Sequence, residues 1–74
     1  MEIEIRLFAS FRKGRWKYKR LHLNDNIQII DVLDILTINE SEIGMILVNG
    51  SYQTTDYKLN DKDILALFPP VAGG

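Results

Sequence analysis

Residues 64–68, Ile-Leu-Ala-Leu-Phe, are apolar at every position, and this run stops at two consecutive prolines. A strand that is apolar on both sides is typical of the covered centre of a sheet. Proline has no amide donor and a fixed φ angle, so Pro69 and Pro70 cannot continue a central strand. We therefore predict that residues 64–68 form the central strand of a sheet and that the chain leaves the sheet at Pro69.

A second strand signal lies at the N-terminus. Residues 2–9 alternate between apolar and polar side chains, with Ile3, Ile5 and Leu7 on one side. This period of two predicts a strand with one buried face. Phe8 falls on the other, polar side. It is expected either to be covered by the following loop at 10–15 or to be an exposed apolar contact.

The loop at 10–15 is predicted to lead into a second hairpin strand at residues 16–23. In a regular strand, alternate residues face the same side of the sheet. The two aromatic residues, Trp16 and Tyr18, would therefore face one side, and the two leucines, Leu21 and Leu23, would face the other. A β-bulge near residues 19–20 would account for this change of side.

A helix is predicted at residues 27–36, after a stretch of capping residue types at 24–26. Its β-branched side chains argue weakly for a strand, but no alternation continues past Asp31. Four apolar residues instead follow the i, i+3, i+4, i+7 spacing of one helix face: Ile29, Val32, Leu33 and Leu36.

The remaining signals describe a strand at 45–48, a tight turn at Asn49-Gly50 and a short return strand at 51–54. A turn at 60–63 then precedes the final strand. The order β-β-α-β-β-β predicts an α+β fold with a mixed sheet and one helix packed across it, which is the ubiquitin-like β-grasp arrangement. Residues 1–68 would form this body and residues 69–74 a flexible tail.

The sequence has no set of residues suited to independent catalysis. The absence of cysteine excludes disulfides, thiolate metal sites and a cysteine nucleophile. His22 stands alone, and Asp61 and Asp63 lack the glycine and distal glutamate of a calcium loop, so we expect no metal site. The reactive group of the tail is the carboxylate of Gly74.

Positive charge is concentrated in one segment, which holds six of the nine Lys and Arg residues: Arg12, Lys13, Arg15, Lys17, Lys19 and Arg20. Interleaved with Trp16 and Tyr18, they offer a candidate nucleic-acid surface. We favour an edge strand that its lysines protect from edge pairing, and we expect no nucleic-acid partner. With no apolar run long enough to span a bilayer and no signal-peptide pattern, we expect no membrane partner and a cytoplasmic location.

Three stretches of the chain resemble the MoaD/ThiS family of ubiquitin-like sulfur carriers: residues 47–50 (LVNG), 59–64 (LNDKDI) and 68–74 (FPPVAGG). The opening Leu7-Phe8-Ala9 adds to this resemblance, which thereby spans nearly the whole chain. The ending is most similar to MoaD, the small subunit of molybdopterin synthase, because ThiS proteins more often lack the Pro-Pro step.

The resemblance implies that an E1-like adenylating enzyme of the MoeB type uses ATP to activate Gly74. Sulfur then replaces the adenylate and leaves a thiocarboxylate. The partner that receives this sulfur would be the large subunit of molybdopterin synthase, of the MoaE type, or a thiazole synthase if the chain is ThiS-like. The carrier would be a non-catalytic sulfur donor with no cofactor of its own. A ubiquitin-like modifier conjugated through Gly74 is an alternative.

The resemblance also implies roles for the residues around the tail. An apolar docking patch would comprise Phe8, Phe68 and Tyr52, although an aliphatic residue is commoner in the family at the last position. The tail would thread a narrow channel in the partner with five residues ahead of Gly74: Pro69, Pro70, Val71, Ala72 and Gly73. Extended, the four residues after Pro70 reach about 13 Å.

Overall fold

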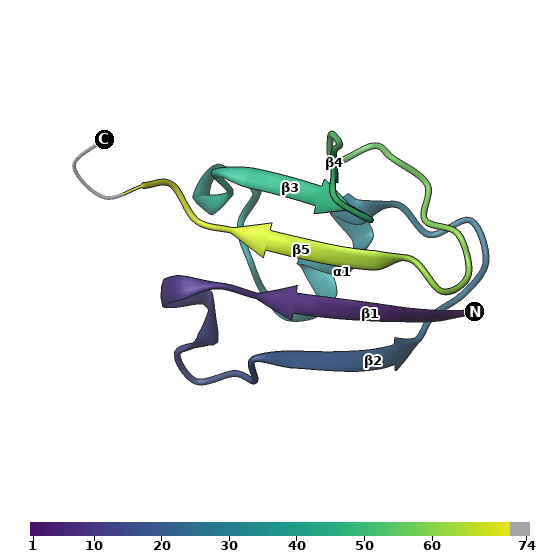
Figure 1. Ribbon diagram of the computed structural model, residues 1–74, viewed down its shortest axis with the longest axis horizontal. Coiled ribbons are helices and arrows are strands. Elements are labelled where there is room, and N and C mark those ends of the chain that lie inside the picture. The colour runs from purple at the N-terminus through teal and green to yellow at the C-terminus, as the bar shows by residue number, and fades with distance from the viewer. Residues whose placement is uncertain (72–74) are drawn as a thin grey trace.

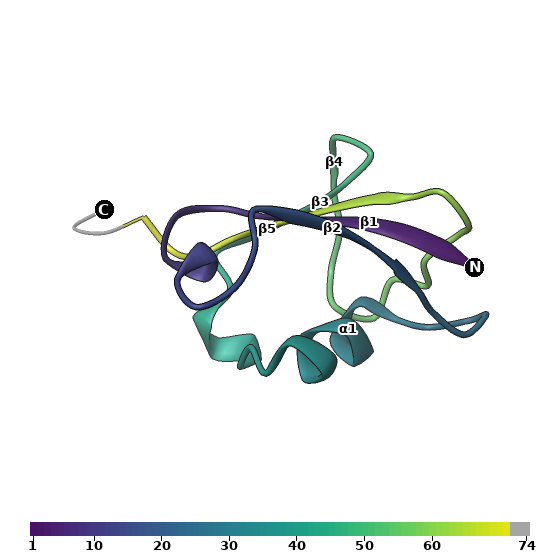
Figure 2. The same cartoon turned by 90° about the horizontal axis from the view of Figure 1, so that it is seen from below.

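The computed structural model describes residues 1–71. Five strands form one mixed sheet in the order β2-β1-β5-β3-β4, and a single α-helix packs across one of its faces (Figures 1 and 2). The elements are β1 (Glu2–Leu7), β2 (Tyr18–His22), α1 (Ile29–Leu36), β3 (Met45–Val48), β4 (Ser51–Tyr52) and β5 (Ile64–Phe68), with 3-10 helices η1 (Ala9–Arg12) and η2 (Glu40–Glu42). The predicted α+β, β-grasp fold is confirmed.

The predicted central position of β5 is confirmed. This strand runs parallel to β1, with Leu65 beside Ile5, and antiparallel to β3, with Phe68 beside Met45. Leu65 is fully buried on the helix face. Because β1 and β5 are parallel, the C-terminal ends of both strands lie at the same end of the sheet, where the tail leaves (Figure 1).

The core lies between the sheet and α1. It contains the predicted alternating residues of β1, three of the four predicted residues of the α1 stripe, and their partners from β3 and β5: Ile3, Ile5, Leu7, Ile29, Val32, Leu33, Ile46, Val48, Leu65 and Leu67. Leu36, the fourth residue of the stripe, is partly buried and packs against this core. Because the strand side chains in this core project from one face of β1, β3 and β5, the opposite face of the sheet is left for other contacts.

The predicted bulge in β2 is wrong. The pairing with β1 is continuous from Glu2 beside His22 to Arg6 beside Tyr18. Trp16 lies before the first residue of β2, so the alternation of side chains in the strand does not decide which side it faces, and it packs against the core. Tyr18, the first residue of β2, is 62% exposed. No change of side within the strand is needed.

The predicted capping stretch at 24–26 is also wrong. The helix begins after Gln28, whose backbone N–H donates to the Asp31 carboxylate at 2.9 Å. Gln28 forms an isolated bridge with Lys58, and the Leu59 N–H donates to the Ile27 carbonyl. Residues 27–28 are therefore held extended by a distant segment, which delays the start of α1.

The Asn49-Gly50 turn has positive φ at both residues, 50° and 87°, as a type I′ turn requires. The Asn49 side chain also connects this turn to β5. Its amide donates to the buried Asp63 carboxylate at 2.8 Å, and its oxygen accepts the Ile64 N–H at 2.9 Å. The predicted return strand is shorter than expected, since β4 ends at Tyr52.

Arg15 connects the basic segment to the helix. Its guanidinium donates to the carbonyl of Leu36 at 3.2 and 3.3 Å and to that of Phe11 at 3.2 Å. Leu36 is the last residue of α1, where unpaired carbonyls and the helix dipole favour a cation. Part of the positive charge in this segment therefore stabilises the fold.

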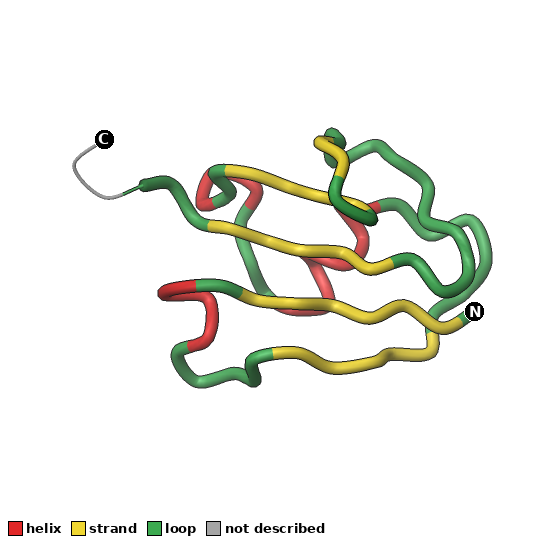
Figure 3. Tube along the Cα trace, in the orientation of Figure 1, coloured by secondary structure: helices red, strands yellow, loops and turns green. Residues whose placement is uncertain are grey.

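Both 3-10 helices lie at the end of the sheet from which the tail departs, and the N-terminus lies at the opposite end (Figure 3). None of the helices within residues 1–71 has the length and hydropathy required to cross a bilayer.

Candidate functional site

The face of the sheet opposite α1 is divided into an apolar half and a charged half. The apolar half consists of the outward residues of β5 and β3 together with one residue of β4: Ile64, Ala66, Phe68, Met45, Leu47 and Tyr52. The charged half comes from β1 and β2. A partner that docks on this face would meet both kinds of surface.

An aromatic pair lies where the two halves meet, at the root of the tail. The rings of Phe8 and Phe68 stack with their centroids 4.2 Å apart and their planes 16° from parallel. The Phe8 N–H donates to the Leu67 carbonyl at 3.2 Å, which fixes the backbone that carries the ring. Both rings are only partly buried. The pair thus presents apolar surface directly before Pro69.

Arg12 also contacts the aromatic pair. Its guanidinium carbon lies 5.3 Å from the centre of the Phe8 ring, and its Nε donates to the Leu7 carbonyl at 2.8 Å. This is a cation–π arrangement with the guanidinium held by the backbone. Phe8 is therefore covered in part by the turn that follows it and in part by Phe68.

Tyr52 and Phe68 line one groove on this face, together with Met45, Gln53 and Pro69. The hairpin that carries Tyr52 rises from the sheet on the side away from α1 (Figure 2), and its side chain is 77% exposed. Phe8 borders a separate, basic hollow. The three predicted docking residues are thus arranged on one face, with Phe68 in the middle.

The tail begins on this face. Pro69 is partly buried, Pro70 is exposed, and Val71 is 83% exposed. Figure 1 shows residues 69–71 continuing beyond the end of β5 and away from the sheet. The predicted threading residues Ala72 and Gly73 and the predicted reactive residue Gly74 lie outside the described residues.

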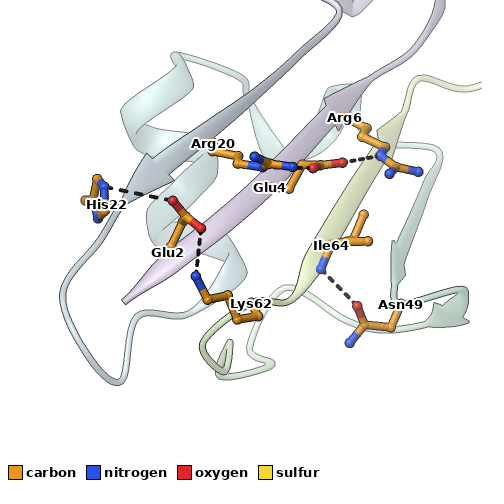
Figure 4. A network of polar contacts seen from close by, with 8 residues as sticks. All are labelled: Glu2, Glu4, Arg6, Arg20, His22, Asn49, Lys62 and Ile64. Atoms are coloured by element: carbon orange, nitrogen blue, oxygen red, sulfur yellow. Dashed lines mark hydrogen bonds and ion pairs between the residues drawn. The ribbon is translucent and has the colours of Figure 1, made fainter.

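The charged half is an ion-pair network (Figure 4). Glu4 accepts from Arg6 at 2.6 Å and from Arg20 at 3.3 Å. Glu2 accepts from Lys62 at 2.9 Å and lies 4.0 Å from His22. These pairs are solvent-exposed, so each contributes little to stability.

The network changes the pKa values of its members. The hydrogen bond from Lys62 holds the pKa of Glu2 below its ordinary value, and the same bond raises the pKa of Lys62. The hydrogen bond from Arg6 lowers the pKa of Glu4. The backbone N–H of Glu2, 2.8 Å from Asp61, lowers the pKa of that carboxyl.

Three residues of the basic segment have contacts within the chain: Arg12 with Phe8, Arg15 with the end of α1, and Arg20 with Glu4. Trp16 packs against the core, so this ring is withdrawn from any stacking surface. Both findings favour the interpretation of an ordinary charged edge over that of a nucleic-acid surface. No group of three or more His, Asp and Glu side chains within residues 1–71 is arranged to hold a metal ion.

Nothing in the sequence pattern singled out Arg12 or Gly44, which both lie at the tail root. Arg12 reaches Phe8 only because η1 folds back after β1, and Gly44 lies beside the tail only because β3 pairs with β5. The four-residue spacing from Phe8 to Arg12 is a weak signal that could have indicated the first contact.

A five-stranded mixed sheet, one covering helix and a tail that leaves from the central strand define a ubiquitin-fold carrier domain. The chain belongs to the ThiS family, whose model matches residues 5–74. This is a family of ubiquitin-fold sulfur carriers related to MoaD. No match was found among curated protein sequences.

Three solved structures similar to this chain are of archaeal proteins. The HVO 2177 protein of Haloferax volcanii is 32% identical with a TM-score of 0.80, over 100% of this chain and 87% of that one. SAMP1 of the same organism, a small archaeal modifier protein, is 27% identical over the whole of both chains, with a TM-score of 0.79. A Pyrococcus furiosus protein with the provisional designation of molybdopterin converting factor, subunit 1, is 25% identical, covers 96% of this chain and 99% of its own, and has a TM-score of 0.79.

Proposed function

We propose that this protein is a sulfur carrier of the MoaD type, whose Gly74 carboxylate is adenylated and converted to a thiocarboxylate that donates sulfur in molybdopterin biosynthesis. The observation that carries the proposal is the stacked Phe8–Phe68 pair directly before the Pro69-Pro70 step. It combines an apolar docking surface with the root of a tail that ends in a carboxylate. Membership of the ThiS family supports the sulfur-carrier role.

The chemistry explains why an activating enzyme is required. A carboxylate is ionised at neutral pH and is a poor electrophile. Its attack on the α-phosphate of ATP releases pyrophosphate and forms an acyl adenylate. A sulfur nucleophile then attacks the acyl carbon, AMP leaves, and the thiocarboxylate remains. The E1-like enzyme supplies these reactions, and the carrier supplies the carboxylate. Because activation consumes ATP, we place the protein in the cytoplasm.

The body and the tail have separate roles in this scheme. Phe8, Phe68 and Tyr52 dock on the activating enzyme and then on the enzyme that receives the sulfur, either a MoaE-type subunit or a thiazole synthase. Pro69 and Pro70 stiffen the start of the tail, because each has a fixed φ angle. Val71, Ala72 and Gly73 are small enough to enter a narrow channel, so the reactive group can reach a buried site while the body stays outside.

A second candidate function is that of a ubiquitin-like modifier joined to target lysines through Gly74. The likeness to SAMP1, a modifier protein, favours it. The Pyrococcus furiosus likeness instead favours the molybdopterin role. Both functions begin with adenylation of the same carboxylate, so they differ in what attacks the acyl adenylate.

Intact mass measurement separates these functions. The purified chain is incubated with the adenylating enzyme of its own organism, ATP and a sulfur source. Exchange of one oxygen for one sulfur supports the carrier. If no exchange occurs and conjugates to lysine form instead, the modifier function holds. Mixing the loaded carrier with a MoaE-type subunit or with a thiazole synthase, each with its precursor, then identifies the pathway.

A further inference from the structure

Gly44 lies directly against the root of the tail. It precedes β3, and the antiparallel register that pairs Met45 with Phe68 places Gly44 opposite Pro69. The Gly44 N–H donates to the Phe68 carbonyl at 2.8 Å. Pro69 and Pro70 have no backbone N–H, so neither of these tail residues can donate a hydrogen bond back to the segment that contains Gly44.

The backbone conformation of Gly44 does not explain why glycine is needed there. Among the described glycines, Gly14 and Gly50 have positive φ angles, whereas Gly44 does not. Gly44 is also exposed, so its small size is not required for core packing. Any requirement for glycine at this position must come from what lies beside its α-carbon.

What lies beside it is the peptide bond between the two prolines. A Cβ on residue 44 would lie 2.6 Å from the Pro69 carbonyl oxygen, 2.6 Å from the Pro70 nitrogen and 2.7 Å from the Pro69 carbonyl carbon. These are backbone atoms, so a Cβ could be accommodated only if the chain itself moved. The two prolines restrict that movement, because Pro69 constrains Phe68 and Pro70 constrains Pro69.

We infer that Gly44 is a positioning residue that sets the direction in which the tail leaves the body. Its missing side chain lets the Pro69–Pro70 peptide lie directly against the backbone of residue 44, just before β3, and the stiff proline pair carries that direction outward to Val71. The inference rests on the proposed function for its consequence: the tail must point into the channel of a partner already docked on the Phe8–Phe68 pair. A body that docks correctly with a misdirected tail would be bound but not loaded.

The first test uses only the carrier. In a weakly aligned sample, the residual dipolar coupling of the Val71 N–H in the wild-type chain should fit the alignment tensor of residues 1–68. It should deviate in Gly44→Ala, while the couplings of the core strands still fit one tensor. A wild-type Val71 coupling averaged to near zero would overturn the inference. So would a coupling unchanged by the substitution. If Gly44→Ala fails to fold, the wild-type coupling of Val71 alone still tests whether the tail has a fixed direction.

The second test uses ATP–pyrophosphate exchange by the adenylating enzyme. Gly44→Ala should lower kcat by about 100-fold, because a small misplacement of a reacting group is costly, and should leave KM unchanged. Gly14→Ala is the matched control: it also adds a Cβ, in a strained positive-φ site with nothing within 4 Å, and should keep its kcat. In a Pro69→Ala/Pro70→Ala background, where the tail can move aside, the added effect of Gly44→Ala should shrink to about twofold or less.

The outcomes separate the inference from the proposed function. If the wild-type chain is not adenylated but the Val71 couplings behave as expected, the proposed function fails and the positional role of Gly44 stands. If the wild-type chain is adenylated and Gly44→Ala is adenylated equally well, the inference is wrong and the proposed function stands. A rise in KM without a fall in kcat would assign Gly44 to docking and would also contradict the inference.

Discussion

Phe8 and Phe68 come from opposite ends of the chain and stack at 4.2 Å, because β1 and β5 run parallel and end together. The two rings pack together at the end of the sheet from which the tail leaves. A partly exposed aromatic pair of this kind is typical of the residues that dominate binding energy in protein interfaces. The pair therefore links the fold of the chain to its proposed docking function.

The aromatic pair gives the first prediction. Phe8→Ala should raise the Kd for the adenylating enzyme by about tenfold or more, because the partner loses an apolar anchor. Titration calorimetry measures this directly. Ile35→Ala, which removes an exposed apolar side chain from α1 on the other side of the sheet, is the control and should bind normally. Equal affinity of the Phe8 variant and the wild-type chain would remove Phe8 from the docking surface.

Tyr52 gives the second prediction. Its ring is exposed and lines the groove beside Phe68 and Pro69. Tyr52→Leu keeps apolar area and should change the Kd by about threefold or less, whereas Tyr52→Asp places a charge in the interface and should weaken binding by about tenfold. If both variants bind like the wild-type chain, the groove wall formed by β4 lies outside the interface.

Arg15 gives the third prediction, which concerns stability. Arg15→Ala removes the donors that pair with the Leu36 carbonyl and should lower the free energy of unfolding by about 1 kcal/mol. Urea denaturation gives this value. Lys13→Ala removes an equal charge from the same segment and should have little effect. A larger loss from Lys13→Ala than from Arg15→Ala would contradict the capping role.

The ion-pair network gives the fourth prediction. The pKa values of Glu2 and Glu4 are lowered in the folded chain by Lys62 and Arg6 respectively. The two carboxylates therefore stabilise the fold above the ordinary glutamate pKa, and this stabilisation is lost as the pH falls through the lower folded pKa. The pKa of Lys62 is raised in the folded chain. Its charge therefore stabilises the fold below the ordinary lysine pKa, and this stabilisation is lost as the pH rises through the higher folded pKa.

Glu2→Gln should therefore flatten the dependence of Tm on pH at both extremes, by a small amount that added salt reduces. Asp34→Asn, on the exposed side of α1 and outside the network of Figure 4, is the control. A Glu2→Gln profile identical to that of the wild-type chain at low salt would show that the Glu2–Lys62 pair does not stabilise the fold.

The fold was predictable wherever a local pattern carries the information. The alternation of Ile3, Ile5 and Leu7 fixes the buried face of β1, and the uniformly apolar run at 64–68 marks the central strand. The Asn49-Gly50 dipeptide specifies its turn through the φ angles that it permits.

The wrong helix start came from contacts between distant segments, whereas the wrong bulge came from including Trp16 in a strand that begins at Tyr18. Residues 27–28 are extended because residues 57–59 pair with them, which no helix signal near Asn26 could reveal. The aromatic and tail residues of the candidate site were predicted from a family resemblance. Their arrangement was not predicted, because the stack of Phe8 on Phe68 and the approach of Gly44 to Pro69 depend on which strands become neighbours.

The most direct test of the central claim is the intact mass of the chain after incubation with the adenylating enzyme, ATP and a sulfur source, with Gly74→Ala treated in parallel. The wild-type chain should exchange one oxygen for one sulfur, and the variant should remain unchanged with nearly the same Tm, because the substitution falls in the predicted tail and outside the predicted body at residues 1–68. An unchanged wild-type mass, or equal loading of both chains, would contradict the account.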